Sequence, residues 1–487
     1  MISSMAVMPL LALSFLPSLA LVAFGQTATV GSYNAPAGGE WTSLTLNLRD
    51  QRYQSASTIN FQNVGALGLR WSIITPSSVT AEPVVKNGRV YFADWNGNVY
   101  SVVLSTGKLL WNVSLGQTIS STPALADGLV YVAGGGHGNF ASDGSVVFAL
   151  SPRDGRVVWK TVVNPTMAIW ASPIVYRGLL YVGVAGGGAL SPCYEENSPA
   201  CKGEMYALNA LNGKVVWNFA TSGTAGGAGI WGSVAIDPKL NALYFGTGNA
   251  YSGSGTVGYA YSIVSLNAAT GKLNWFYQPY NSTAAGDDLD FGSTPNLFTV
   301  KVNGIFHSAV GLGSKDGRYY VLDRTNGALL EEPMIGVPGD RLGIFGLAGF
   351  MARTAGNPEL FIPVHYNPSQ SPLCHDNSTG VGTDGADCGA VRALFPKTGS
   401  IPWTFVSKGW VLGSVALVPG AVLFGDVEGN LYAISTSGTA LYHYQLPSGV
   451  FSGVTVAEGS VVVPLAGNCR CADFGASGTS GVSMFSA

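Results

Sequence analysis

A glycine followed four residues later by a tryptophan recurs along the whole chain and constrains its fold more than any other feature. Each copy follows an apolar stretch rich in Tyr and Leu and a turn that ends in the glycine. Complete copies span 107–111, 155–159, 213–217, 271–275 and 399–403, and weaker copies at Gly327 and Gly438 carry another residue in place of the tryptophan. A unit repeated at this scale predicts a repeat architecture, and a radial one surrounds an axis where a site can form.

Every repeat contains short strands of β-branched and aromatic residues separated by Gly, Asn and Asp turns. This pattern is typical of four-stranded antiparallel sheets. One such sheet cannot bury both of its faces, whereas sheets arranged around an axis cover one another. We therefore predict an all-β chain folded as an eight-bladed β-propeller. The repeated tryptophans are expected to pack between neighbouring blades, because each can bury roughly 150–250 Å².

The number of blades depends on both ends of the chain. The last repeat has three strands, over 454–456, 461–464 and 482–485, and lacks the strand that carries tryptophan. That strand occurs near the other end of the sequence, over 69–73 with Trp71. We therefore predict that an N-terminal strand joins the last blade and closes the ring. The other seven repeats start near Ala81, Thr122, Ala171, Gly232, Gly292, Gly346 and Gly413.

Composition supports a turn-rich β fold and excludes several classes of protein. Only 10% of the 487 residues are charged, and 66 are Gly. A disordered chain has more charge and fewer aromatic residues. The formal net charge of −3 and the lack of a basic run argue against a nucleic-acid partner.

The first 25 residues resemble a targeting segment. Residues 6–24 are almost wholly apolar, and Ala23 and Gly25 are small residues at the two positions that a signal peptidase reads. An uncleaved anchor is the alternative, since no basic residue precedes Arg49. We predict a cleaved signal peptide over 1–25, an N-terminal segment over 26–65 and the propeller over 66–487. The protein is then secreted, extracellular or periplasmic, with no later segment long enough to span a membrane.

Six cysteines fit an oxidising compartment. One of the three pairs, Cys469 and Cys471, is separated by a single residue, so these two form a strained disulfide or each pairs elsewhere. The other two pairs bracket one short loop each and predict local disulfides, Cys193 with Cys201 and Cys374 with Cys388. Three Asn-x-Ser/Thr acceptors predict a glycoprotein if the host glycosylates, at Asn112, Asn281 and Asn377.

The eight-bladed pattern resembles the pyrroloquinoline quinone (PQQ)-dependent, or quinoprotein, alcohol dehydrogenase family, especially its polyvinyl-alcohol-dehydrogenase-like branch. The resemblance begins at 47–55, before the first blade, and covers nearly the whole chain after the targeting segment. Residues 230–237 and 244–249 are similar to the blade that stacks the quinone and binds calcium. Residues 288–296 are similar to the segment that carries the catalytic aspartate.

The resemblance implies oxidation of a small alcohol or polyol. In that family PQQ lies across the central channel, and Ca²⁺ polarises its carbonyl as a Lewis acid. A carboxylate removes the alcohol proton, and the cofactor carries the redox chemistry. By position, Asp290 would be the catalytic base, Asn249 and Asp290 would bind Ca²⁺, and Glu82, Trp231 and Lys315 would contact the quinone.

Each of these residues also has a purely structural interpretation. Trp231 could pack between blades, although it lies outside the repeated tryptophan position. The remaining four have common structural roles: Asn249 as a turn residue after a glycine, Asp290 as a turn cap, Lys315 as a solvated side chain in a Lys-Asp-Gly turn, and Glu82 as a strand-end residue.

Several departures from the family pattern argue for a second interpretation. The metal-binding Glu expected after the strand 180–183 is absent, because residues 184–188 contain no carboxylate. The second blade lacks the Arg and the adjacent Cys pair that contact the cofactor. No Cys-x-x-Cys-His occurs, so no c-type haem is expected and electrons would pass to a separate acceptor. The alternative to a secreted quinoprotein is therefore an extracellular binding or assembly module that has lost the cofactor.

Overall fold

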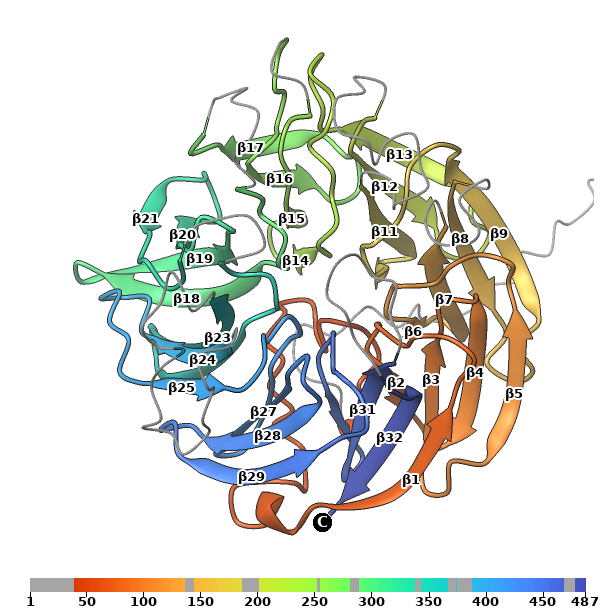
Figure 1. Ribbon diagram of the computed structural model, residues 1–487. Helices are drawn as coiled ribbons and strands as arrows, with labels where there is room; N and C mark the ends of the chain where they lie inside the picture. Colours follow the sequence, from red (N-terminus) through yellow and green to blue (C-terminus); the bar gives the residue numbers. More distant parts are fainter. Residues whose placement is uncertain are drawn as a thin grey trace, which may run out of the picture.

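The chain folds as a ring of eight four-stranded antiparallel sheets around a central axis (Figure 1). The computed structural model describes residues 39–135, 144–185, 201–251, 255–280, 289–337, 343–366, 374, 388–467 and 478–487. A short 3-10 helix, η2 (Val64–Ala66), precedes the first strand. None of the described helices is long and apolar enough to cross a membrane. The predicted all-β, eight-bladed propeller is confirmed.

We number the blades along the chain, and in each the first strand lies nearest the axis. Blade 1 contains β2 (Val84–Lys86), β3 (Arg89–Ala93), β4 (Asn98–Val103) and β5 (Leu109–Ser114). Blade 2 contains β6 (Ala124–Ala126), β7 (Leu129–Gly134), β8 (Ser145–Leu150) and β9 (Val157–Asn164). Blade 3 contains β10 (Ile174–Tyr176), β11 (Leu179–Val184), β12 (Glu204–Asn209) and β13 (Val215–Ala220). Blade 4 contains β14 (Ala235–Asp237), β15 (Ala242–Gly246), β16 (Ile263–Asn267) and β17 (Leu273–Tyr277).

The second half of the ring repeats this order. Blade 5 contains β18 (Asn296–Val302), β19 (Ile305–Gly313), β20 (Tyr319–Asp323) and β21 (Leu329–Glu331). Blade 6 contains β22 (Gly349–Thr354), β23 (Asn357–Tyr366), β24 (Cys388–Leu394) and β25 (Thr404–Ser407). Blade 7 contains β26 (Ala416–Val418), β27 (Ala421–Gly425), β28 (Asn430–Ser435) and β29 (Ala440–Gln445). Blade 8 contains β30 (Thr455–Ala457), β31 (Ser460–Ala466), β32 (Ser480–Ser486) and β1 (Gly68–Ile74).

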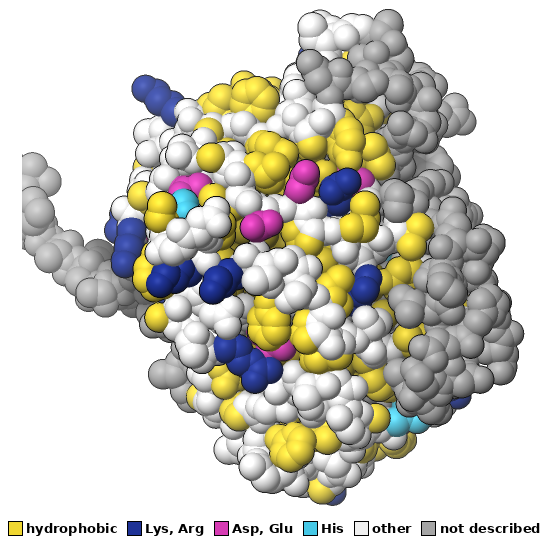
Figure 2. All heavy atoms as spheres, turned by 90° about the vertical axis from the view of Figure 1, so that its left-hand side faces the viewer, with side chains coloured by type: hydrophobic (Ala, Val, Ile, Leu, Met, Phe, Trp, Pro, Cys, Tyr) yellow, Lys and Arg dark blue, Asp and Glu magenta, His cyan; other side chains and the backbone are white. Residues whose placement is uncertain are grey.

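Burial follows distance from the axis. The first strand β10 is buried throughout, whereas the fourth strand β13 alternates between exposed and partly buried residues. The apolar core therefore lies between the sheets, and the fourth strands face solvent. On the side of the ring seen in Figure 2, Lys and Arg side chains are interspersed with acidic and apolar ones.

The ring closes as the sequence predicts. β1 pairs antiparallel with β32, from Gly68 opposite Ser486 to Ile74 opposite Gly481. The side chain of Arg70 hydrogen-bonds Ser486, which is 416 positions away in the sequence. Blade 8 is thus shared by the two ends of the chain.

The repeated tryptophans lie in the seams between consecutive blades, which confirms the expected packing role. A Cβ atom on Gly155 would come within 2.6 Å of the Trp111 ring, so the glycine of one blade admits the tryptophan of the blade before it. Each indole N–H also donates a hydrogen bond of 2.8–3.2 Å to a backbone carbonyl of the next blade. The pairs are Trp71–Leu104, Trp111–Pro152, Trp159–Ala210, Trp217–Ala268, Trp275–Arg324 and Trp403–Thr436.

A chain of hydrogen bonds links blades 1 to 5 where their first strands begin near the axis. The backbone N–H of one blade donates to a side-chain oxygen of the next blade. The bonds run from Glu82 to Thr122, from Thr122 to Ser172, from Ser172 to Ser233 and from Ser233 to Thr294, at 2.9–3.1 Å. At the junction of blades 8 and 1, the N–H of Gly453 donates to the carboxylate of Glu82.

The segment before the first blade crosses one end of the axis. Its backbone carbonyls accept hydrogen bonds from the N–H groups of six first strands, at 2.7–3.0 Å. The pairs are Trp41 with Val85, Thr42 with Leu125, Leu48 with Ile236, Arg49 with Leu297, Gln51 with Phe350, and Arg52 with Leu417. This segment therefore joins six blades to one another.

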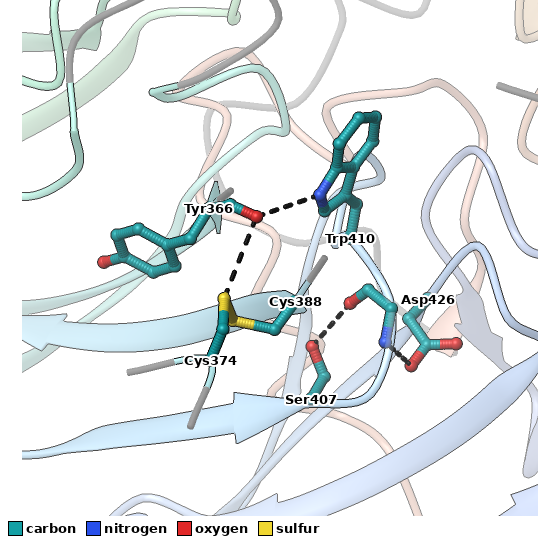
Figure 3. Close-up of a disulfide and its surroundings, with 7 residues drawn as sticks. Tyr366, Cys374, Cys388, Ser407, Trp410 and Asp426 are labelled. Carbon is teal, nitrogen blue, oxygen red and sulfur yellow. Dashed lines mark hydrogen bonds between the residues drawn. A yellow bond between two sulfur atoms is a disulfide. The ribbon is translucent and has the colours of Figure 1, made fainter. Parts of the chain in front are cut away.

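One predicted disulfide is described completely. Cys374 and Cys388 are bonded, with their Cα atoms 5.4 Å apart, as expected for a local bridge (Figure 3). Cys201 is also disulfide-bonded, but its predicted partner Cys193 lies outside the described residues. The pair Cys469 and Cys471, the targeting segment 1–25 and the acceptors Asn281 and Asn377 also lie outside them, while Asn112 is exposed on β5.

Candidate functional site

The fold brings four of the predicted site residues to one end of the axis. Trp231 precedes β14, and Asn249 lies between β15 and β16. Asp290 precedes β18, and Lys315 lies between β19 and β20. In an antiparallel blade the start of the first strand and the end of the second strand share one end of the sheet. The connections that carry these residues therefore meet at the same mouth of the ring, in blades 4 and 5.

Asp290 and Lys315 form an ion pair at the centre of this group. Their carboxylate oxygen and ammonium nitrogen are 3.2 Å apart, and the two residues are only 6% and 8% exposed. The other oxygen of Asp290 accepts a hydrogen bond of 2.6 Å from the backbone N–H of Asn249. The backbone N–H of Lys315 donates to the carbonyl of Asp290 at 2.9 Å. The carboxylate is thus oriented by the Asn249 N–H of blade 4, and its charge is balanced by Lys315 of blade 5.

Two aromatic rings flank the ammonium group of Lys315. Its nitrogen lies 5.3 Å from the centre of the Trp231 ring and 4.9 Å from that of Phe345. The two rings are 5.8 Å apart and tilted by 54°. Both side chains are half-buried, so aromatic surface remains accessible beside the ion pair. Trp231 is therefore placed beside Lys315 rather than in the seam position of the repeated tryptophans.

Sequence reasoning missed Phe345, although a local signal exists. Phe345 stands between Ile344 and Gly346, and Trp231 stands between Ile230 and Gly232, each just before a first strand. The shared Ile-aromatic-Gly pattern marks equivalent positions in blades 4 and 6. Comparing repeats position by position would have placed both rings at the same mouth.

Gly292 makes room for Trp231. A Cβ atom at Gly292 would lie 1.7 Å from the Trp231 ring, a distance that no side chain tolerates. The ring therefore rests against the backbone two residues after Asp290. Any side chain at position 292 would therefore have to displace the tryptophan ring.

Ring contacts continue from Phe345 through blade 6 to blade 7. The rings of Phe345 and His365 are 4.6 Å apart, and those of His365 and Trp410 are 5.6 Å apart. The indole N–H of Trp410 donates to the carbonyl of Tyr366 at 3.1 Å, and Cys374 Sγ lies 3.9 Å from the same oxygen (Figure 3). A row of rings thus connects the ion pair to the disulfide.

Glu82 occupies a different environment from the other predicted site residues. It is fully buried and pairs with Arg52 at 2.8 Å. Burial raises the pKa of Glu82, although the positive charge of Arg52 opposes that shift. Arg52 also donates to the carbonyl of Val415 and lies 5.0 Å from the centre of the Trp41 ring. Among the described residues, no hydrogen bond or ion pair links Glu82 to the Asp290 group. Its carboxylate instead binds Arg52, in the segment that crosses the axis, and the N–H of Gly453.

The described residues offer few ligands for a metal. No group of three or more His, Cys, Asp or Glu side chains converges anywhere in the described part of the chain. At the mouth, the oxygen-bearing side chains predicted to bind Ca²⁺ are the carboxylate of Asp290 and the carboxamide of Asn249. The carboxamide has no hydrogen-bond partner among the described residues.

Comparison with known proteins identifies the family. A PQQ-repeat model with the description "Outer membrane protein assembly factor BamB" matches residues 26–330. This chain belongs to that PQQ-repeat family. The resemblance to quinoprotein alcohol dehydrogenases is confirmed, because curated proteins similar to this chain are alcohol dehydrogenases of that kind.

Two curated relatives and one solved structure illustrate this similarity. The quinohemoprotein alcohol dehydrogenase ADH IIB of Pseudomonas putida is 28% identical, and the match covers 67% of this chain and 52% of that protein. A polyvinylalcohol dehydrogenase of Pseudomonas sp is 25% identical, covering 87% of this chain and 70% of that protein. The quinohemoprotein alcohol dehydrogenase structure from Comamonas testosteroni has a TM-score of 0.74 at 21% identity, covering 93% and 81% of the two chains. The PQQ-repeat chain thus shares its fold with these enzymes and spans about half the length of the first relative.

Proposed function

We propose that this PQQ-repeat protein is a secreted quinoprotein-type oxidoreductase that oxidises a small alcohol or polyol and passes electrons to a separate acceptor. The observation that carries the proposal is the buried Asp290–Lys315 pair beside the rings of Trp231 and Phe345. The similarity of the chain to alcohol dehydrogenases supports the proposal. Secretion is supported by the disulfides, which persist in oxidising compartments.

The side chains at the mouth fit the chemistry of PQQ, a flat and anionic ring system. Trp231 offers an aromatic face, and Lys315 offers a positive charge next to that face. When bound, such a quinone accepts the hydride equivalent that the alcohol loses. Ca²⁺ prefers oxygen ligands, so Asp290 and Asn249 are the described side chains that would hold it, as part of the six to eight oxygens that the ion takes.

Within this proposal each residue of the mouth has one task. Asp290 accepts the proton of the alcohol hydroxyl, and the Asn249 N–H keeps its carboxylate oriented. The ammonium group of Lys315 balances the negative charge of the Asp290 carboxylate. Trp231 and Phe345 exclude water from one side of the ion pair. A positioned base of this kind contributes roughly 10²–10⁴ to the rate.

The experiment is reconstitution of the purified full chain with PQQ and Ca²⁺. Binding is followed by quenching of tryptophan fluorescence, and turnover by dye-linked oxidation of alcohols and polyols. Asp290→Asn should lower the rate by roughly 10²–10⁴. The matched control, Asp154→Asn in an exposed turn between β8 and β9, should leave it unchanged. Absence of PQQ binding at micromolar concentrations would refute the proposal.

One observation favours a second candidate function. The charge of Asp290 is already balanced by Lys315, so the site is electrostatically complete without a metal. Together with the assembly-factor description of the family, this is consistent with an extracellular binding or assembly module. A chain that binds no PQQ in the titration and still folds as eight blades would support that candidate.

A further inference from the structure

The connection between the second and third strands has one design in blades 1 and 7. It begins with an aspartate, Asp94 or Asp426, whose backbone N–H and carbonyl close the turn. The carboxylate of that first residue accepts a hydrogen bond from a tyrosine of the third strand. The bonds are Tyr100 to Asp94 at 2.8 Å and Tyr432 to Asp426 at 3.3 Å.

The equivalent turn of blade 5 has the same backbone hydrogen bonds, but its aspartate is at a different position. Ser314 occupies the first position of the turn. Its N–H donates to the carbonyl of Arg318 and its carbonyl accepts from the N–H of Gly317, as in the turns of Asp94 and Asp426. The aspartate is now at the third position, as Asp316, directly after Lys315. The phenol of Tyr320, in β20, still donates to it, at 2.5 Å.

The displaced carboxylate gains a second phenol. Tyr280 donates to Asp316 at 2.6 Å, and the backbone N–H of Arg318 donates to its other oxygen at 2.8 Å. Asp316 is only 4% exposed, and three donors therefore fix its orientation. Burial and the hydrogen bond to Asp316 raise the pKa of Tyr280 to about 12, so the phenol stays a donor at physiological pH.

Tyr280 belongs to the connection that also carries Asp290. It follows β17, and Asp290 precedes β18 in the same connection. Two more bonds join that connection to the turn, from Ser314 Oγ to the carbonyl of Leu289 at 3.2 Å and from the Lys315 N–H to the carbonyl of Asp290 at 2.9 Å. The ring of Tyr320 also packs 5.2 Å from that of Phe291. The turn of Lys315 and the segment of Asp290 are thus fastened together at several points.

We propose that Asp316 is a positioning residue that, through Tyr280 and Tyr320, holds Lys315 against Asp290 and beside the rings of Trp231 and Phe345. A lysine side chain has many rotamers, and a fixed backbone on both sides of it restricts where its ammonium group can lie. Blades 1 and 7 have no lysine at the second turn position, and within the described part of the chain no second phenol donates to their carboxylates. Of the three turns, only that of blade 5 carries a charged residue of the mouth, Lys315, and only this turn binds the additional tyrosine, Tyr280.

The repeat supplies a matched control for the test. Tyr280→Phe removes the added phenol, whereas Tyr432→Phe removes the phenol of the equivalent turn in blade 7. The first measurement is the rate of reductive methylation of Lys315 in the ligand-free full chain, read by peptide mass spectrometry. Tyr280→Phe should raise this rate roughly tenfold, the scale of one hydrogen bond to a charged group, and Tyr432→Phe should leave it unchanged.

A second measurement tests whether the positioning of Lys315 by Asp316 affects PQQ binding, and this part rests on the proposed function. PQQ affinity, from fluorescence quenching, should fall in Tyr280→Phe and stay constant in Tyr432→Phe. If the wild type binds no PQQ while Lys315 still becomes reactive in Tyr280→Phe, the proposed function fails and the positioning role stands. If both variants change Lys315 methylation equally, or neither does, the positioning role is overturned.

Discussion

Replacing Gly155 by Ala tests the seam between blades 1 and 2. Gly155 has a φ of +73°, and a Cβ atom there would come within 2.6 Å of the Trp111 ring. Two separate penalties are therefore expected. The left-handed backbone costs an alanine about 1–2 kcal/mol, and forcing a methyl group into a packed seam costs about 1–3 kcal/mol.

Gly128 separates these two penalties. Its φ is +76°, but a Cβ atom at that position would meet nothing within 4 Å. Gly128→Ala should thus lower the free energy of unfolding by the backbone penalty alone, about 1–2 kcal/mol. Gly155→Ala should lower it by about 2–5 kcal/mol in total.

Urea unfolding of the two variants measures the difference. A third comparison, Gly155→Ala in a Trp111→Leu background, should lose the steric part of the cost because the ring is gone. Equal destabilisation by Gly155→Ala and Gly128→Ala in the wild-type background would show that the ring moves aside freely. The tryptophan would then not be the rigid part of the seam, and its ring would not be the reason for the glycine at position 155.

Three further predictions concern the axis, the disulfide and the mouth. Burial raises the pKa of the Asp50 carboxyl well above its usual value, so the folded state holds this proton more tightly than the unfolded state does. The free energy of unfolding of the wild type should therefore fall relative to that of Asp50→Asn as the pH rises from about 4, measured by urea unfolding across pH. A difference in unfolding free energy that stays constant with pH would contradict this. Replacing both Cys374 and Cys388 by Ser opens a bridge between residues 14 positions apart and should lower the free energy of unfolding by about 3 kcal/mol, whereas an unchanged midpoint would mean that the loop is held by other contacts. Gly292→Ala should displace the Trp231 ring and weaken PQQ binding roughly two- to tenfold, since one aromatic stacking contact contributes about 0.5–1.5 kcal/mol. Unchanged affinity would show that Trp231 is not part of the binding surface.

The fold was predictable because its decisive signals are local and repeated. The glycine and tryptophan of one motif are four positions apart, yet each contacts a neighbouring blade, so the spacing reports the seam as well as the strand. The closure by Trp71 was predictable for the same reason, since a missing strand at one end matched an extra strand at the other.

The candidate site was predictable only in part. Asp290, Lys315 and Trp231 lie together as their positions in a related family suggest, while Phe345 was hidden in an apolar stretch that also suits a strand start. The partner of Glu82 could not be read from its surroundings, because Arg52 reaches it only through the path of the N-terminal segment across the axis. Such a path depends on contacts with six blades and leaves no periodic trace in the sequence.

Closure of the ring by β1 has a consequence for how molecules behave before they finish folding. The strand that completes blade 8 lies at the opposite end of the sequence from its partner β32, so this pairing has among the largest sequence separations in the chain. Contacts of that kind form late. Until then β32 presents an open edge, and β1 of a second copy carries the same side chains as the molecule's own. Refolding at high concentration therefore favours exchange of β1 between copies, with each blade 8 completed by a neighbour.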